Sequence, residues 1–166
     1  MTRRTLYAAL AIVTMMVVLS IPGQTQTGTP NKLGGFIDDF TADLDGNGPW
    51  QISGEWSLAL KGQSGRADLS VTLNMVRSDT TPRSAHTHHI TLTDGSVSQI
   101  PNGFHVSGNA TIASNGNLAG FSGSFIDLQI TGGNSVPASN VALTFSGGAA
   151  GHFGNQPFHG PVTRRE

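Results

Sequence analysis

Residues 50–75 read WQISGEWSLALKGQSGRADLSVTLNM, and this stretch decides the fold class. Apolar side chains occupy every second position on both sides of a glycine-containing turn at residues 61–65; they are Trp50, Ile52, Trp56, Leu58, Leu60, Ala67, Leu69, Val71, Leu73 and Met75. A period of two places these side chains on one face of a β-strand, which is typical of a half-buried strand. The stretch therefore predicts two long strands that pair as a hairpin.

Shorter alternating segments follow, separated by turn residues. Further strands are expected at residues 86–93, 97–100, 104–112, 122–130, 141–145 and 158–162. Asp94-Gly95 and Pro101-Asn102-Gly103 predict tight turns, and a change of alternation after Phe125 predicts a bulge. Residues 33–40 fit a short helical turn or an edge segment. The chain is thus expected to be all-β, with about eight antiparallel strands in a small up-and-down or partly closed barrel; a β-sandwich is the alternative.

The N-terminal residues have the pattern of an export signal. Arg3 and Arg4 precede an apolar run from Leu6 to Leu19, shorter than the about 20 residues that span a membrane. We expect a signal peptide over residues 1–23 with an uncertain cleavage site, a linker over 24–35 and one β domain over 36–166. The expected location is periplasmic or extracellular, with a membrane contact only through an uncleaved N-terminal segment. The paired arginines also fit the twin-arginine export route.

The composition limits the class of partner. The formal net charge is −1, and 11% of residues are charged against a typical value of about 25%. Between Ser84 and Thr163 the only acidic or basic residues apart from histidine are Asp94 and Asp127. No strong positive field is available to attract nucleic acid, so a metal ion or a small molecule is the expected partner. Cysteine is absent, and a domain of this length has enough core to fold without disulfides.

Histidines cluster in residues 84–92, SAHTHHITL. Strand alternation points His86 and His88 to the same side as Ile90, and His89 to the opposite side. Two neutral imidazoles two residues apart on one strand can bind a single transition metal ion. An imidazole hydrogen-bonded to a backbone carbonyl or a threonine is the alternative.

Additional metal ligands are expected from the glycine-rich C-terminal segment. His152 and His159 lie there and would complete a zinc or copper site with the two strand histidines. His105 is expected on the polar face of its own strand. Asp127 is expected either at the surface or as the acid that orients a histidine.

A second candidate metal site precedes Trp50. Asp43, Asp45 and Asn47 have the spacing of the first half of a calcium loop, followed by Gly48. The bidentate acid expected six residues after that glycine is replaced by Gly54. Calcium binding is therefore one hypothesis, and an exposed turn of Asp and Asn residues is the other.

Three classes of function stay open from the sequence. The first is an exported barrel with a histidine-lined pocket for a divalent transition metal or a small molecule. The second is a non-enzymatic barrel that binds a small apolar ligand, with Trp56, Ile90 and Phe104 lining the pocket. The third is a structural or surface module without a small-molecule site. No nucleophile elbow, phosphate loop or dinucleotide fingerprint is present to indicate a reaction.

Overall fold

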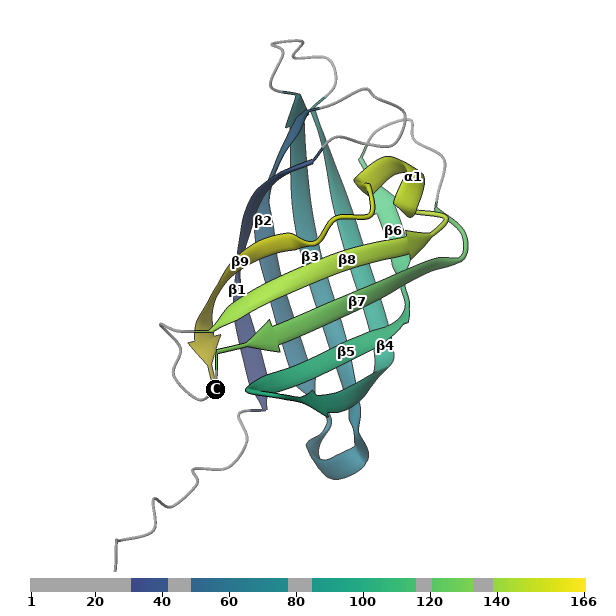
Figure 1. Ribbon diagram of the computed structural model, residues 1–166. Helices are drawn as coiled ribbons and strands as arrows, with labels where there is room; N and C mark the ends of the chain where they lie inside the picture. Colours follow the sequence, from purple (N-terminus) through teal and green to yellow (C-terminus); the bar gives the residue numbers. More distant parts are fainter. Residues whose placement is uncertain (1–30, 42–48, 78–84, 116–120, 133–138) are drawn as a thin grey trace, which may run out of the picture.

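The computed structural model describes residues 31–41, 49–77, 85–115, 121–132 and 139–166 (Figure 1). These residues are almost entirely β-structure. The strands are β1 (Lys32–Thr41), β2 (Trp50–Leu60), β3 (Arg66–Arg77), β4 (His86–Ile100), β5 (Gly103–Asn109), β6 (Thr111–Ser114), β7 (Ser124–Thr131), β8 (Asn140–Gly147) and β9 (Phe158–Arg165). A 3-10 turn, η1 (Gly62–Ser64), joins β2 to β3, and a short helix, α1 (Ala150–Phe153), lies between β8 and β9.

Eight of these strands close into an antiparallel barrel. Their order is β3-β2-β1-β9-β8-β7-β5-β4, and pairing between β3 and β4 joins the two ends. β6 is an additional short strand that pairs with β4 over His88–Thr91, beyond the part of β4 that pairs with β5. Closure gives each of these eight strands a paired neighbour on both sides. The all-β barrel prediction is confirmed, and the structure is a closed barrel instead of the alternative sandwich.

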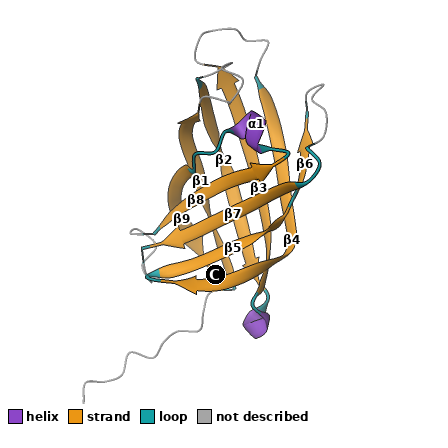
Figure 2. Cartoon of the chain, turned by 45° about the vertical axis from the view of Figure 1, so that its right-hand side comes forward, coloured by secondary structure: helices purple, strands orange, loops and turns teal. Residues whose placement is uncertain are grey.

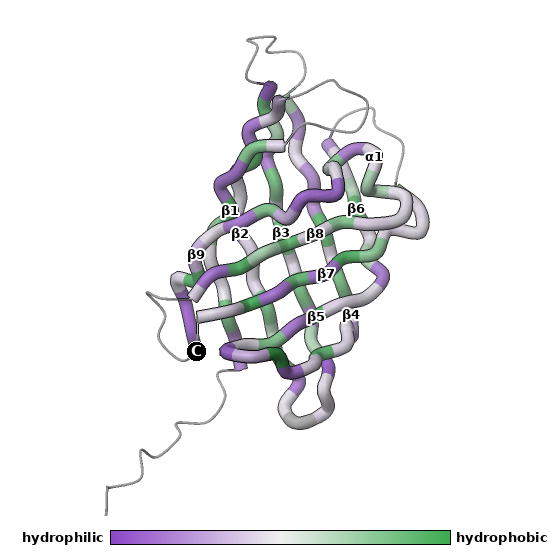
Figure 3. Tube along the Cα trace, in the orientation of Figure 1, coloured by the Kyte–Doolittle hydropathy of each residue, from purple (hydrophilic) through white to green (hydrophobic). Residues whose placement is uncertain are grey.

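The barrel interior contains the apolar side chains that alternate along residues 50–75. Ile52, Trp56 and Leu58 of β2 and Leu69 and Leu73 of β3 are fully buried. Apolar and polar segments alternate along each strand in Figure 3. The two predicted strands form a regular antiparallel hairpin from Trp50↔Arg77 to Leu60↔Ala67. The hydrophobic core is therefore the inside of the barrel.

The expected turn at Asp94-Gly95 is wrong. β4 runs through these residues, and its register with β3 shifts between Ala67 and Leu69. Asp94 has a φ of 58°, and this positive φ lies at a bulge within one long strand instead of in a chain reversal. The extra residue reverses the alternation, since Leu92 and Gly95 are both buried. The backbone N–H of Asp94 donates to the Asp68 carboxylate at 2.8 Å and holds the bulge in place.

The linker expected over residues 24–35 extends past the start of the first strand. β1 begins at Lys32, so residues 32–35 belong to the barrel, and the helical-turn alternative for residues 33–40 is wrong. Leu33 and Ile37 are buried in the hydrophobic core, and β1 pairs with both β2 and β9. A Cβ at Gly35 would lie 2.1 Å from the Pro161 carbonyl oxygen, so glycine permits the close approach of β9. The expected signal peptide lies outside the described residues, among which no helix is long and apolar enough to cross a membrane.

The expected bulge after Phe125 is also wrong. β7 keeps a regular register with both β5 and β8. Phe125 is an outward-facing residue with 39% of its surface exposed, and Ile126 is buried. The break in the apolar pattern therefore comes from an exposed phenylalanine and not from an irregular strand.

Helix α1 lies at the upper end of the barrel in the view of Figure 2. The side chain of Phe153 is fully buried and stacks on Phe145 with ring centroids 4.1 Å apart. The hydroxyl of Thr41 donates to the Phe153 carbonyl at 3.1 Å. The helix thereby inserts an aromatic side chain into the core at this end.

Candidate metal centre

Three histidines from two distant parts of the chain meet beside α1. The Nε2 atom of His152 lies 3.1 Å from Nε2 of His86 and 3.0 Å from Nε2 of His88. His88 is fully buried, and the other two side chains are half-buried. The three side chains offer one nitrogen each within 4.8 Å of one another, which is close enough to bind one metal ion. We call these three residues the histidine trio.

Strand pairing places the first two members of the trio. His86 lies opposite Met75 of β3, and His88 lies opposite Leu73, so both histidines follow the inward face of the barrel. The third member depends on the single turn of α1. This turn buries Phe153 in the core and brings the preceding residue, His152, against the strand histidines.

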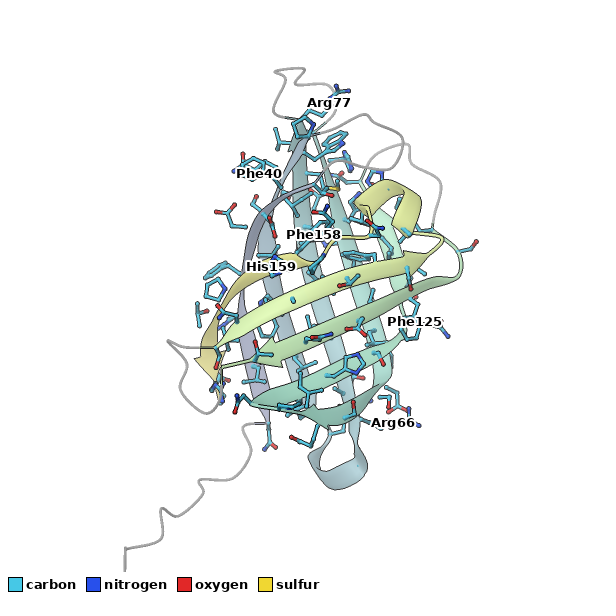
Figure 4. All side chains as sticks on the ribbon, viewed as in Figure 1. Phe40, Arg66, Arg77, Phe125, Phe158 and His159 are labelled. Atoms are coloured by element: carbon cyan, nitrogen blue, oxygen red, sulfur yellow. The ribbon has the colours of Figure 1, made fainter. Side chains whose placement is uncertain are left out.

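Aromatic rings surround the trio. The ring centroid of Trp50 lies 5.2 Å from that of His86, and the centroid of Phe121 lies 5.2 Å from that of His152. Phe153 lies 4.8 Å from His88, edge to face. The guanidinium of Arg77, which Figure 4 labels at the upper end of the barrel, lies 5.8 Å from the centre of the Trp50 ring.

Burial holds His88 in its neutral form. Desolvation in these surroundings, together with charge repulsion from the neighbouring His152, His86 and His89, lowers the pKa of His88 to about 3. A neutral imidazole keeps a lone pair on one ring nitrogen, as a metal ligand must. The Nδ1 atom of His88 is buried and has no hydrogen-bond partner among the described residues.

The two nitrogen separations from His152 fit a coordination sphere. With Zn–N bonds of about 2.05 Å, two ligand nitrogens lie about 2.9 Å apart at a right angle and about 3.3 Å apart at the tetrahedral angle. The distances from His152 to the other two nitrogens, 3.1 and 3.0 Å, fall inside this interval. Two of the three separations therefore suit a common ion, and the ligand atoms of His86 and His88 lie within 4.8 Å of each other.

The structure does not bring His159 into the trio. His159 lies on β9 with 60% of its side chain exposed, as Figure 4 shows on the outside of the barrel. Both its Nδ1 atom and its backbone N–H lie 2.9 Å from Oδ2 of Asp39. Burial raises the pKa of Asp39, but hydrogen bonds from the Phe40 N–H and from His159 outweigh this effect and lower the pKa below its ordinary value.

The remaining histidines lie away from the trio. His89 is exposed, as expected, with Nδ1 3.3 Å from the Thr72 hydroxyl. His105 binds the Asp127 carboxylate through Nε2, and its Nδ1 atom is 3.3 Å from the Ser98 hydroxyl. Asp127 therefore orients a histidine, but one on β5 and outside the trio.

The other predicted site residues have different positions. Trp56 and Ile90 are fully buried in the hydrophobic core, and Phe104 packs against that core while half-buried. The Nε1 atom of Trp56 is buried without a hydrogen-bond partner in the described part of the chain. The apolar-ligand pocket stays a prediction. The expected calcium ligands Asp43, Asp45 and Asn47 lie outside the described residues.

Sequence reasoning missed the part played by Phe153. Phe153 follows His152 in a glycine-rich segment whose apolar residues repeat with neither the strand nor the helix period. No sequence pattern therefore identifies it as a core residue. The one available signal was its size, since it is a large apolar side chain next to a histidine. No family model, curated protein or solved structure matches this chain.

Proposed function

We propose that this protein binds a divalent transition metal ion, zinc or copper, at one end of its barrel through the histidine trio. The observation that carries the proposal is the convergence of three Nε2 atoms, at 3.0 and 3.1 Å, from a strand and a helix. Imidazole nitrogen is a preferred ligand of both ions. The chain contains no cysteine that would compete as a softer ligand.

Hydrogen bonds alone satisfy this arrangement poorly. A neutral imidazole nitrogen carries either one proton or one lone pair, so His152 Nε2 can form only one well-directed bond although it faces two nitrogens. His88 already has one buried nitrogen, Nδ1, without a partner among the described residues, and such an atom costs about 1–3 kcal/mol. One metal ion removes this conflict because each histidine then contributes its lone pair to the same acceptor.

Three protein ligands leave room for a further ligand on the ion. Catalytic zinc sites commonly combine three protein ligands with a water molecule or substrate, whereas structural sites use four. His86 and His152 are half-buried, which supports access from solvent on their side of the trio. We propose an open position at this metal, occupied by water or a small molecule.

We also propose that the protein acts outside the cytoplasm. The support is the N-terminal pattern, in which Arg3 and Arg4 precede the apolar run Leu6–Leu19. Mass spectrometry of the mature protein from cell fractions tests this location. Full-length protein found only in the cytoplasm would contradict it.

Metal titration of the chelator-treated protein tests the site itself. Calorimetry and elemental analysis should give one zinc or copper ion per wild-type chain, and the double variant His86→Ala/His88→Ala should lose it. His89→Ala is the matched control, because this histidine is adjacent in sequence but faces outward to Thr72. Wild-type protein that binds no near-stoichiometric metal would overturn the proposal.

A further inference from the structure

The trio joins two elements that are attached to the barrel in different ways. β4 is paired with β3 on one side and with β5 and β6 on the other. α1 is a single turn, in which the N–H groups of His152, Phe153 and Gly154 donate to the carbonyls of Ala149 and Ala150. One helical turn is not stable by itself in water. The position of α1 therefore depends on its contacts with the barrel, among them the hydrogen bond from the Thr41 hydroxyl to the Phe153 carbonyl.

Glycines lie on both sides of this helix. Gly147, at the end of β8, has a φ of 68°, and Gly154, directly after α1, has a φ of 80°. Glycine enters such conformations at low cost and leaves them as easily. Gly148 and Gly151 add further positions without a side chain. The Gly148 N–H donates to the Gly123 carbonyl at 3.4 Å, so a displacement of α1 would use the backbone torsions after Gly148.

The docked position of α1 closes the core at this end of the barrel. Phe153 contacts Phe145 at 4.1 Å and Phe158 at 6.2 Å between ring centroids. A displacement of α1 would withdraw this side chain and uncover the neighbouring apolar side chains. His152 directly precedes Phe153 in α1. A metal ion bound to the histidines of β4 would hold the helix through this residue.

We propose that the metal ion is a latch: its binding ties α1 to β4 and closes this end of the barrel, and its loss lets α1 open. The inference rests on the proposed metal-binding function of the trio. Without the ion, His152 Nε2 can bond well to only one of its two neighbours at 3.0 and 3.1 Å. With the ion, coordinate bonds link the helix to both His86 and His88. Release of α1 then requires a metal–ligand bond to break.

Amide hydrogen exchange measures this opening directly. The probe is Zn²⁺ added to the chelator-treated full chain, and the reporters are the amides of His152, Phe153 and Gly154, which are hydrogen-bonded inside α1. Without zinc we expect these amides to exchange faster than those of the β2–β3 hairpin. At a free zinc concentration of 100 times Kd, their protection should rise about 100-fold, because only the docked state binds the ion.

Two single variants separate the latch from general stabilisation. His152→Ala leaves both strand histidines in place and should abolish the effect of zinc on the remaining α1 amides. His159→Ala removes a histidine that lies on β9 and bonds Asp39, so the zinc effect should persist in full. Circular dichroism and exchange of the β2–β3 amides confirm that each variant is folded.

The outcomes distinguish the latch from the site. If zinc binds through the trio but α1 protection does not change, the latch is overturned and the metal site stands. If α1 amides already exchange as slowly as the hairpin amides without zinc, the latch is overturned as well. If zinc does not bind, both proposals fail.

Discussion

The Nε2 atoms of His88 and His152 lie 3.0 Å apart although 64 positions separate the two residues in the chain. One is held in a strand paired on both sides, and the other is carried by a one-turn helix. An ion bound between them would connect the two ends of this long loop. Its effect should therefore be visible in the stability of the whole barrel as well as at the site.

Zinc should raise the free energy of unfolding of the wild-type protein. If only the folded chain binds the ion, the gain is about 2.7 kcal/mol at a free zinc concentration of 100 times Kd. Differential scanning calorimetry should show a higher Tm that falls back when a chelator is added. The double variant His86→Ala/His88→Ala should show no shift at the same zinc concentration. An equal shift in wild type and variant would place the stabilising ion elsewhere.

The barrel and the inward orientation of the strand histidines can be predicted from the sequence, because both depend on local periodicity. Alternation in residues 50–75 predicted the β2–β3 hairpin, and the same rule placed His86 and His88 on the inward face. Burial on one face of a strand imposes a period of two on the sequence itself. Such features require no knowledge of distant contacts.

The remaining features depend on contacts that local patterns do not encode. A positive φ at Asp94 is compatible with a chain reversal and with a bulge. The bulge forms because β4 pairs with β3 on both sides of this residue. His152 and His159 looked equivalent in a glycine-rich segment. α1 brings the first to the trio, whereas the register of β9 leaves the second beside Asp39.

Replacing His88 with leucine should abolish metal binding without destabilising the metal-free barrel. His88 is fully buried, and its Nδ1 atom has no hydrogen-bond partner among the described residues. Removal of such an atom relieves a penalty of about 1–3 kcal/mol, which offsets the imperfect fit of the new side chain. Chemical denaturation with chelator present should give an unfolding free energy equal to or above that of wild type.

The comparison variant for His88→Leu is Leu73→Ala, directly opposite in β3. Truncation of this buried leucine should cost about 2–5 kcal/mol, because it leaves a cavity in the core. A loss of similar size in His88→Leu would mean that the histidine is a structural residue with a partner of its own. That result would weaken the argument that the site is retained for metal binding.

Truncation of Phe153 should destabilise the barrel and weaken its metal affinity together. The ring is fully buried and stacks on Phe145, so Phe153→Ala should cost about 3–5 kcal/mol. Loss of this contact also removes the packing that holds His152 near the strand histidines. Denaturation and zinc calorimetry on the same samples measure both effects. Phe125→Ala, in which the lost ring is 39% exposed, should change neither quantity by more than about 0.5 kcal/mol.

The Asp39–His159 pair should give the barrel an acid-dependent part of its stability. The folded-state pKa of Asp39 is lowered below 3.8: burial raises it, and the bonds from the Phe40 N–H and from His159 outweigh that effect. The unfolded chain therefore takes up a proton on this group at a higher pH than the folded chain does. The stabilising contribution is fully present above the unfolded-state pKa and is lost as the pH falls from about 4 through the lower folded-state pKa.

The variant Asp39→Asn should be less stable than wild type at pH 7 and should lose less stability than wild type below about pH 4. His159→Ala should reproduce part of this change, since it removes the ring bond at 2.9 Å but keeps the backbone bond to the carboxylate. Urea denaturation between pH 2 and pH 7 measures the three curves. Parallel curves for wild type and Asp39→Asn would show that the carboxylate titrates alike in the folded and unfolded chains, contrary to the hydrogen bonds that it accepts in the seam between β1 and β9.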